Sequence, residues 1–331
     1  AALAGEATLE LARLDAEIGA SFAGYGPVLL RSEAASSSQI EHLTASARSV
    51  LSAEAGIKTG QNAQMIASNT RAMQAALGLA GDLSAESIRA MHRALMEEQP
   101  RHTPGEFRTE AVWIGSRSDS PVGADFVAPH HSRVATLVDD LTAFARQAEA
   151  PSLVTTAVAH AQFETVHPFS DGNGRTGRAF AQAMLRNRGV LRSVAVPVSA
   201  GLLADVRGYH RALQAYRDGH IDPIVNVLAQ ASLRAVWNSR TLVSELDNVR
   251  ASWASRLKAR PNSNAWRLLG VVVRRPVLSA KTAAEELGTS PSNVYGPLKA
   301  LVDSGILKSK QEHRMGPFWR ADEVLDALDR F

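Results

Sequence analysis

The sequence predicts a largely α-helical protein with a small β-hairpin, and two observations carry this prediction. The segments Ser152–Val166 and Arg175–Arg188 are rich in alanine and place apolar residues at helical spacing, and Gly189 follows the second segment as a stop signal. Helical periodicity lapses at Phe107–Gly115, where β-branched and aromatic residues are mixed with polar ones in the manner of a short strand pair. We therefore expect helices to dominate the fold, with one hairpin among them.

The composition is that of a globular chain. Of 331 residues, 45% are apolar and 21% are charged. A chain of this length typically forms about two domains. No apolar run reaches the length of a membrane span, so we expect no membrane partner. Ala1–Ala23 is interrupted by acidic and basic residues, which is typical of an amphipathic helix and not of a secretory leader.

The cysteine count and the net charge exclude several function classes. The chain contains no cysteine, which excludes disulfides, cysteine nucleophiles and thiolate metal sites and is compatible with the reducing, cytoplasmic location that we expect. The formal net charge of +3 is too small for a chain of this size to indicate nucleic-acid binding by itself. Any such interaction has to be argued from local sequence.

The segment from His167 to Arg178 reads His-Pro-Phe-Ser-Asp-Gly-Asn-Gly-Arg-Thr-Gly-Arg and joins the two predicted helices. Because it opens a helix, the backbone N–H groups of Gly172, Asn173 and Gly174 lack intrahelical partners. The two glycines let the chain curl closely around an anion. The segment is therefore predicted to bind phosphate.

Charged side chains in the same segment add the means for chemistry on a phosphate ligand. Arg175 and Arg178 are three residues apart and share a helix face, so both guanidinium groups can reach phosphates. His167 supplies a base that titrates near neutral pH. Asp171 is a hard oxygen ligand suited to the magnesium ion that accompanies a polyphosphate. Phe169 is expected to anchor the loop in the core.

This segment resembles the signature of the Fic-domain family, His-Pro-Phe-x-Asp/Glu-Gly-Asn-Gly-Arg-x-x-Arg, at every fixed position. Most members of that family transfer AMP from ATP to protein hydroxyl groups. The resemblance implies that His167 is the general base, that Asp171 holds Mg²⁺, and that Arg178 grips the γ-phosphate. It also implies an anion hole and a contact to the α/β-phosphate region, formed by Gly172, Asn173, Gly174 and Arg175.

Two interpretations apply to the segment Ser37–Glu41, far upstream of the signature. Ser38-Gln39-Ile40-Glu41 fits a capping box, in which Glu41 would satisfy a backbone donor at a helix start. Ser37-x-x-x-Glu41 also resembles the inhibitory helix of Fic proteins, where the glutamate pairs with the second arginine of the signature. That resemblance implies that Glu41 binds Arg178 in the place of the γ-phosphate, although His42 stands where the family usually has glycine or asparagine.

The predicted hairpin resembles the flap that Fic proteins place over the active site. The runs Pro-Gly-Glu-Phe-Arg at 104–108 and Val-Trp-Ile-Gly at 112–115 carry this resemblance. It implies that an exposed strand edge aligns a target segment by main-chain pairing, with its hydroxyl beside the base. The alternative is a surface hairpin whose tryptophan belongs to the core. The expected docking residues are Arg108, Thr109, Val112 and Trp113.

Two further segments, Gly208–Leu213 and Gly219–Pro223, resemble the helices that close the nucleotide pocket in this family. Tyr209 is expected either to flank the adenine or to lie in the core, since an aromatic residue at helical spacing fits both. Arg217 stands where relatives place a polar residue near the base, which leaves base selectivity open.

A C-terminal domain is predicted after the polar stretch Arg260–Asn264, which follows a long helical region that ends near Leu257. Its order of elements, three helices and then a basic hairpin, resembles the winged helix-turn-helix module that ends many bacterial Fic proteins. The helices are predicted over Trp266–Val273, Ser279–Leu287 and Pro291–Ser304. The hairpin would turn at Gly316-Pro317.

The winged module would bind DNA through residues 261–331, and its alternative is a structural or protein-contact role. From residue 261 onward ten basic residues are balanced by eight acidic ones, and Pro297 lies inside the supposed recognition helix, so the local charge favours DNA only weakly. The third helix would read a major groove and the hairpin would meet phosphates, through Ser292, Asn293, Tyr295, Lys299, Lys308, Lys310 and Arg314.

The sequence thus predicts an all-α Fic core with a small β-hairpin flap, divided into an N-terminal helical region with the inhibitory motif (1–81), the catalytic core with its following helices (82–260) and a winged-helix domain (261–331). The leading hypothesis is an autoinhibited, Mg²⁺-dependent adenylyltransferase that transfers AMP from ATP to a Ser, Thr or Tyr hydroxyl of an unidentified protein. Self-modification is a plausible side activity, and a homodimer is compatible with the sequence. Removal of AMP or transfer of another phosphate-containing group is one alternative, and a nucleotide-sensing DNA-binding regulator is another.

Overall fold

The computed structural model describes residues 2–19, 24–99, 102–115, 120–147, 149–312 and 316–331. The fold is mostly helical (68%), with one two-stranded sheet and one three-stranded sheet near the C-terminus. The predicted fold class, helical with a small hairpin, is therefore confirmed.

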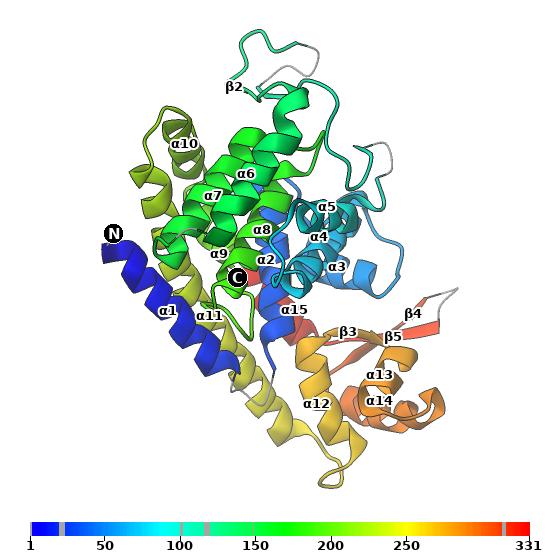
Figure 1. Ribbon diagram of the computed structural model, residues 1–331. Helices are drawn as coiled ribbons and strands as arrows, with labels where there is room; N and C mark the ends of the chain where they lie inside the picture. Colours follow the sequence, from blue (N-terminus) through cyan, green and yellow to red (C-terminus); the bar gives the residue numbers. More distant parts are fainter. Residues whose placement is uncertain (1, 20–23, 100–101, 116–119, 148, 313–315) are drawn as a thin grey trace.

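Helix α2 (Gly26–Ile40) runs through the centre of the molecule (Figure 1). It packs against α4 (Gln61–Gly78), α8 (Asn173–Asn187) and α9 (Val198–Leu203). Because α2 is enclosed by these helices, most of its polar side chains are buried and need partners within the protein. The buried carboxylate of Glu33, for example, accepts hydrogen bonds from both the backbone N–H and the hydroxyl of Ser199.

The capping-box interpretation of residues 38–41 is wrong, because these residues end a helix instead of starting one. Ile40 is the last residue of α2, and the N–H of its C-cap, Glu41, donates to the carbonyl of Ser38. His42 then redirects the chain with a left-handed φ of 60°. The next helix, α3 (Ala47–Glu54), starts only after its own N-cap, Ser46.

The signature segment connects two helices, α7 and α8, that pack against each other. Helix α7 (Ser152–Val166) spans its predicted range, whereas α8 starts two residues earlier than predicted and ends one residue earlier. Gly189 adopts a left-handed φ of 71° just beyond α8, as its predicted role as a stop requires. Helix α5 (Ala85–Met96) packs on α8, whereas α6 (Val134–Gln147), preceded by the 3-10 turn η2 (His131–Arg133), packs on α7 and α5.

A hairpin is present, but it is shorter than predicted and its second strand lies elsewhere. Strand β1 (Trp113–Ile114) pairs antiparallel with β2 (Phe126–Val127), so the partner strand falls outside the predicted run 107–115. The carbonyl of Val112 extends the pairing by accepting a hydrogen bond from the N–H of Ala128. Residues 107–111 form a loop that leads into the hairpin.

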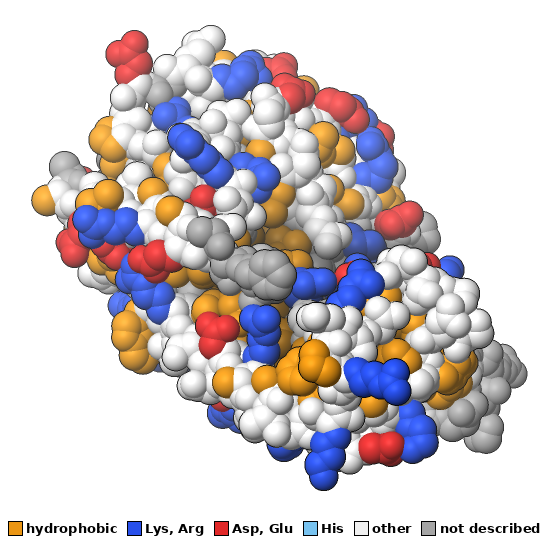
Figure 2. Space-filling model, turned by 90° about the horizontal axis from the view of Figure 1, so that it is seen from below, with side chains coloured by type: hydrophobic (Ala, Val, Ile, Leu, Met, Phe, Trp, Pro, Cys, Tyr) orange, Lys and Arg blue, Asp and Glu red, His pale blue; other side chains and the backbone are white. Residues whose placement is uncertain are grey.

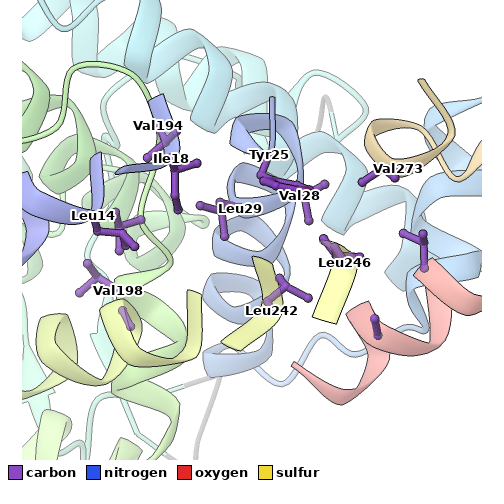
Figure 3. Packing of buried hydrophobic residues seen from close by; sticks show 14 of the residues in the cluster. Leu14, Ile18, Tyr25, Val28, Leu29, Val194, Val198, Leu242, Leu246 and Val273 are labelled. Carbon is purple, nitrogen blue, oxygen red and sulfur yellow. The ribbon is translucent and has the colours of Figure 1, made fainter. Parts of the chain in front are cut away.

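The long helix α11 (Asp222–Arg256) joins the N-terminal helices to the C-terminal elements. It packs against α1 (Ala2–Gly19), α7, α9 and α10 (Val206–Arg217). Figure 3 shows side chains of α1, α2 and α11 meeting in one buried apolar cluster, with Leu14, Leu29 and Leu242 among them. Among the described helices, none is both long and apolar enough to cross a membrane.

The C-terminal elements surround an antiparallel sheet of order β3-β5-β4. The third predicted helix is divided into a 3-10 turn and a short α-helix, and Pro297 lies in the first turn of that helix, where a missing N–H is tolerated. Arg314 lies outside the described residues. The elements are α12 (Asn264–Arg274), β3 (Val277–Ser279), α13 (Ala280–Leu287), η3 (Pro291–Val294), α14 (Tyr295–Asp303), β4 (Lys308–Glu312), β5 (Gly316–Arg320) and α15 (Asp322–Arg330).

The close approach of α9 and α11 generates a stability prediction. A Cβ added at Gly201 in α9 would collide with the backbone of Ala231 in α11. We expect Gly201→Ala to lower the free energy of unfolding by about 1–3 kcal/mol, because two packed helix backbones must separate. The exposed helical glycine Gly5 has open space at its Cβ position, so Gly5→Ala should raise stability by about 0.5–1 kcal/mol. Denaturant unfolding of both variants checks this, and an equal response of the two would contradict it.

Candidate nucleotide site

The loop between α7 and α8 is shaped by two left-handed residues. His167, the C-cap of α7, has φ 49°, and Gly172, the N-cap of α8, has φ 72°. The side chain of Asn173 bridges the loop by accepting from the N–H of Phe169 and donating to its carbonyl. The loop therefore closes on itself and leaves the first N–H groups of α8 directed at the space in front of the helix.

Phe169 is fully buried and anchors the loop, as predicted, but its main partner was not predicted. Its ring stacks on that of His92 in α5 with centroids 3.7 Å apart. His92 also accepts a hydrogen bond from the N–H of Gly105 at Nδ1, and its Nε2 lies 3.1 Å from the carbonyl oxygen of Asp171. Burial lowers the pKa of His92 to about 4, so its ring is neutral at physiological pH. Nothing in the local sequence of α5 indicated this role.

The prediction that Arg108 lines an exposed docking edge is wrong, because its guanidinium is buried behind the loop. Only 5% of Arg108 is exposed. Its donors bind the carbonyl oxygens of His167 (2.8 Å) and Pro129 (2.6 Å), among others. Carbonyl groups left unpaired at the end of α7 recruit this cation, which fixes the turn at His167. Thr109 lies exposed beside it, and Trp113 is half-buried in β1.

His167 faces the cleft with one ring nitrogen already engaged. Its Nδ1 lies 3.3 Å from the carbonyl oxygen of Glu164, which leaves Nε2 as the nitrogen that can accept a proton. The side chain is 18% exposed. Burial lowers the pKa of His167 to about 4, so the imidazole is neutral and able to act as a base near pH 7.

A cleft of about 750 Å³ lies in front of the loop. This volume falls in the usual range for small-molecule sites, which is roughly 300–1,000 Å³. The structure thus brings together, around one cavity, most of the residues that the sequence singled out from the signature and its surroundings. The cleft is lined by Glu41, His167, Asp171, Gly172, Asn173, Gly174, Arg175, Arg178 and Tyr209, among others.

Arg175 lines this cleft and has unsatisfied donors. The side chain is 3% exposed, and its Nε and Nη1 are buried without a hydrogen-bond partner in the described part of the chain. Its Nη2 lies 4.0 Å from Oδ1 of Asp171, at the limit of an ion pair. Buried guanidinium donors without partners carry a free-energy cost, which an anionic ligand in the cleft would remove.

Arg178 is buried on the same helix and is fully engaged by the end of α2. Its Nε donates to the Ser37 hydroxyl (2.9 Å), and its Nη2 donates to the Ser37 carbonyl (2.7 Å) and to Oε1 of Glu41 (2.8 Å). Glu41 and the other charges nearby raise the pKa of Arg178 even though burial opposes its charge. The contact that the resemblance implied between Glu41 and Arg178 is therefore present.

The carboxylate of Glu41 lies directly over the start of α8. A Cβ added at Gly174 would collide with Oε1 of Glu41. Although partial burial opposes ionisation, Arg178 holds the pKa of the Glu41 carboxyl below its usual value. An ionised carboxylate thus occupies a position where the helix N-terminus and Arg178 both attract an anion.

Tyr209 belongs mainly to the core, which is one of its two predicted roles. It is 1% exposed, and its hydroxyl lies 2.7 Å from Nε2 of His160 in α7. Tyr209 is nevertheless among the residues that line the cleft. Arg217 is held over the ring of Phe126 in β2, 3.7 Å from its centroid, and its Nη2 donates to the carbonyl of Glu164.

Asp171 fits a magnesium ion that a polyphosphate brings with it. Its side chain is 43% exposed at the cleft, and its Oδ1 accepts a hydrogen bond from the N–H of Gly172. The described residues contain no cluster of three or more side chains that could hold a metal by themselves. A magnesium ion here would therefore take its other ligands from phosphate oxygens and water, which is its usual mode of binding in nucleotide sites.

The site thus surrounds the start of α8 with cationic side chains and a neutral histidine. Residues 82–185, which include the signature, match the model of the Fic/DOC family.

The chain is also similar to curated proteins in sequence and to solved structures in fold. The chain is 32% identical over 152 residues to protein adenylyltransferase fic-1 of Caenorhabditis briggsae and 27% identical over 178 residues to that of Caenorhabditis elegans. These alignments cover 46% and 53% of the chain but only 27% and 32% of the relatives. A Fic family protein from Desulfovibrio desulfuricans shares the fold over 95% of both chains (TM-score 0.59, 23% identity). Fic-1 from Caenorhabditis elegans shares it over 73% of both (TM-score 0.54, 18% identity).

The neutral, stacked ring of His92 generates a pH prediction. Its pKa of about 4 lies below the ordinary histidine value of about 6.5, so the unfolded chain binds the proton first and stability falls as pH drops from about 6.5 towards 4. The contribution of this one residue reaches about 1.4 kcal/mol per pH unit. Denaturant unfolding at a series of pH values should show a smaller slope for His92→Gln than for the unchanged protein. His220→Gln, at an exposed ring, is the control, and equal slopes in all three proteins would contradict the prediction.

Proposed function

We propose that the protein is a Mg²⁺-dependent protein adenylyltransferase, which transfers AMP from ATP to a hydroxyl group of a protein and is held at low activity by Glu41. One observation carries the proposal: the Glu41 carboxylate lies 2.8 Å from the buried Arg178, in front of the helix start that the signature forms. An anion site of this kind, beside a neutral histidine, supports phosphate chemistry more than simple nucleotide sensing, since binding alone needs no base.

In the proposed reaction the target hydroxyl attacks the α-phosphorus of ATP in line with the departing pyrophosphate. His167 takes the hydroxyl proton at Nε2, and the N–H groups at the start of α8 stabilise the negative charge on the phosphoryl oxygens. Arg175 steadies the α/β region, and Arg178 orients the γ-phosphate once Glu41 has left it. A magnesium ion at Asp171 would neutralise charge on the phosphates.

Target docking is proposed to use the main chain of the flap. The strand β1 borders the cleft through Ile114, which is partly exposed. An extended target segment paired along this edge would carry its Ser, Thr or Tyr hydroxyl towards His167. Thr109, Val112 and Trp113 remain the proposed contacts, whereas the buried Arg108 supports the turn from behind.

In this proposal the C-terminal elements have a structural role and do not bind DNA. Two of the cations predicted to face DNA are already paired, Lys299 with Asp303 (2.6 Å) and Lys308 with Asp322 (2.8 Å). On the face seen from below in Figure 2, Lys and Arg side chains are dispersed among apolar and acidic ones. Binding to DNA phosphates independently of base sequence needs several unpaired cations along one surface.

Intact-protein mass after incubation with ATP and Mg²⁺ tests the proposal. We expect Glu41→Gly to increase self-modification by one AMP at least tenfold, because Arg178 becomes free to hold the γ-phosphate. Glu41→Gly combined with His167→Ala should carry no added AMP while retaining ATP binding. Glu97→Gly, at the exposed C-cap of α5, is the matched control and should behave as the unchanged protein.

The outcomes separate the alternatives. If neither the unchanged protein nor the Glu41→Gly protein gains AMP, cell extract and other nucleotides are added. The result shows whether a missing target or another transferred group is responsible. Loss of AMP from a previously modified protein, dependent on Glu41, would favour AMP removal. Unchanged transfer in the Glu41→Gly protein would show that Glu41 does not restrain the site.

A further inference from the structure

Glu164 lies one helical turn before His167 and has no role in the signature. Its side chain is 6% exposed, and Oε2 lies 4.0 Å from Nδ1 of His167. Its other oxygen, Oε1, is buried and has no hydrogen-bond partner among the described residues. A buried carboxyl group that leaves one oxygen unsatisfied is costly, and such groups concentrate where a protein performs chemistry.

The turn that ends α7 brings these two residues together. The left-handed conformation of His167 folds its ring back against the last turn of the helix, so Nδ1 faces both the carbonyl oxygen of Glu164 (3.3 Å) and its carboxyl group. This conformation is unusual for a residue with a Cβ, and Arg108 holds it from behind through the His167 carbonyl. The arrangement leaves Nε2 directed away from Glu164.

The neighbouring helix makes room for this carboxyl group. A Cβ at Gly177 in α8 would lie 2.8 Å from Oε1 of Glu164 and 2.8 Å from the Phe163 ring. The absence of a side chain at Gly177 thus lets α7 and α8 approach closely enough to enclose the carboxyl group beside His167. A larger residue at position 177 would displace Glu164.

The charged surroundings of Glu164 come from several elements. The residues that face Glu164 are Arg178 of α8, Arg217 and Tyr209 of α10, and Glu41 after α2. Those that face His167 are Arg217, Glu41 and Arg108. Burial is the largest influence and raises the pKa of Glu164 to about 7, against the opposing charge of Arg178. The carboxyl group therefore changes its charge close to neutral pH.

We propose that Glu164 is a positioning residue for His167, which fixes the imidazole with Nε2 towards the cleft and stabilises the imidazolium that forms when His167 accepts a proton. The inference rests on the proposed transfer reaction. In that reaction the hydroxyl proton moves to Nε2, the oxygen forms the new bond to phosphorus, and the bond to pyrophosphate breaks. Glu164 takes up no proton and acts only through its negative charge.

The pH dependence distinguishes this role from a structural one. Below about pH 7 Glu164 is protonated and resembles glutamine, whereas above it the carboxylate can stabilise the imidazolium. In the Glu41→Gly background, we expect Glu164→Gln to lower kcat for AMP transfer about tenfold or more at pH 8 and less than about twofold at pH 6, with KM for ATP unchanged. Glu149→Gln, at an exposed site, should change neither value. A loss of equal size at both pH values would overturn the inference.

A second measurement does not depend on AMP transfer. Diethylpyrocarbonate modifies neutral imidazole at nitrogen, and positive charge develops on the ring as it reacts. We expect modification of His167, followed by peptide mass, to be several-fold slower in Glu164→Gln than in its Glu41→Gly parent at pH 8 and equal at pH 6. If this difference appears without any AMP transfer, the proposed function fails while the role of Glu164 stands. Equal rates at both pH values would refute that role whatever the transfer assay gives.

Discussion

The burial of the Arg178 guanidinium is the constraint on which the rest of the site depends. Only 4% of this residue is exposed, and a buried cation needs both an opposite charge and acceptors for its N–H groups. The end of α2 supplies all of these through Ser37 and Glu41. Helix α2 therefore lies against α8 and ends at residue 40, where Ser37 and Glu41 both reach Arg178.

Local sequence predicts elements whose shape is decided locally. Helix α7 spans its predicted range because its apolar spacing and its glycine-rich successor act within a few residues. The capping-box prediction failed because the end of α2 is decided by distant contacts. Ser38 and Glu41 have the spacing of a helix start, yet the neighbouring Ser37 binds Arg178, which is 141 residues away in sequence. The hairpin is an intermediate case. Strand β1 lies in the predicted run, but its partner β2 lies outside that run and was not predicted from local sequence.

The roles of side chains in the site also divide into those that local sequence predicts and those that depend on tertiary contacts. The residues of the signature meet at one cleft because they share one loop and one helix start, which spacing alone predicts. Arg108, His92 and Glu164 could not be placed in this way, because each acts on the loop from another element or from inside a helix. The position of Glu164 one turn before His167 was a usable signal, whereas His92 carried none.

The two partners of the Glu41–Arg178 ion pair are held very differently, and this difference matters for control. Arg178 keeps two contacts to Ser37 that do not involve Glu41, so its guanidinium stays in place when the carboxylate departs. Glu41 stands at a helix end, is 41% exposed on its side chain and is followed by a strained left-handed residue. Breaking the ion pair therefore requires only that the Glu41 side chain and the short turn after it rearrange. The Arg178 guanidinium remains in position to bind an anion that replaces the Glu41 carboxylate.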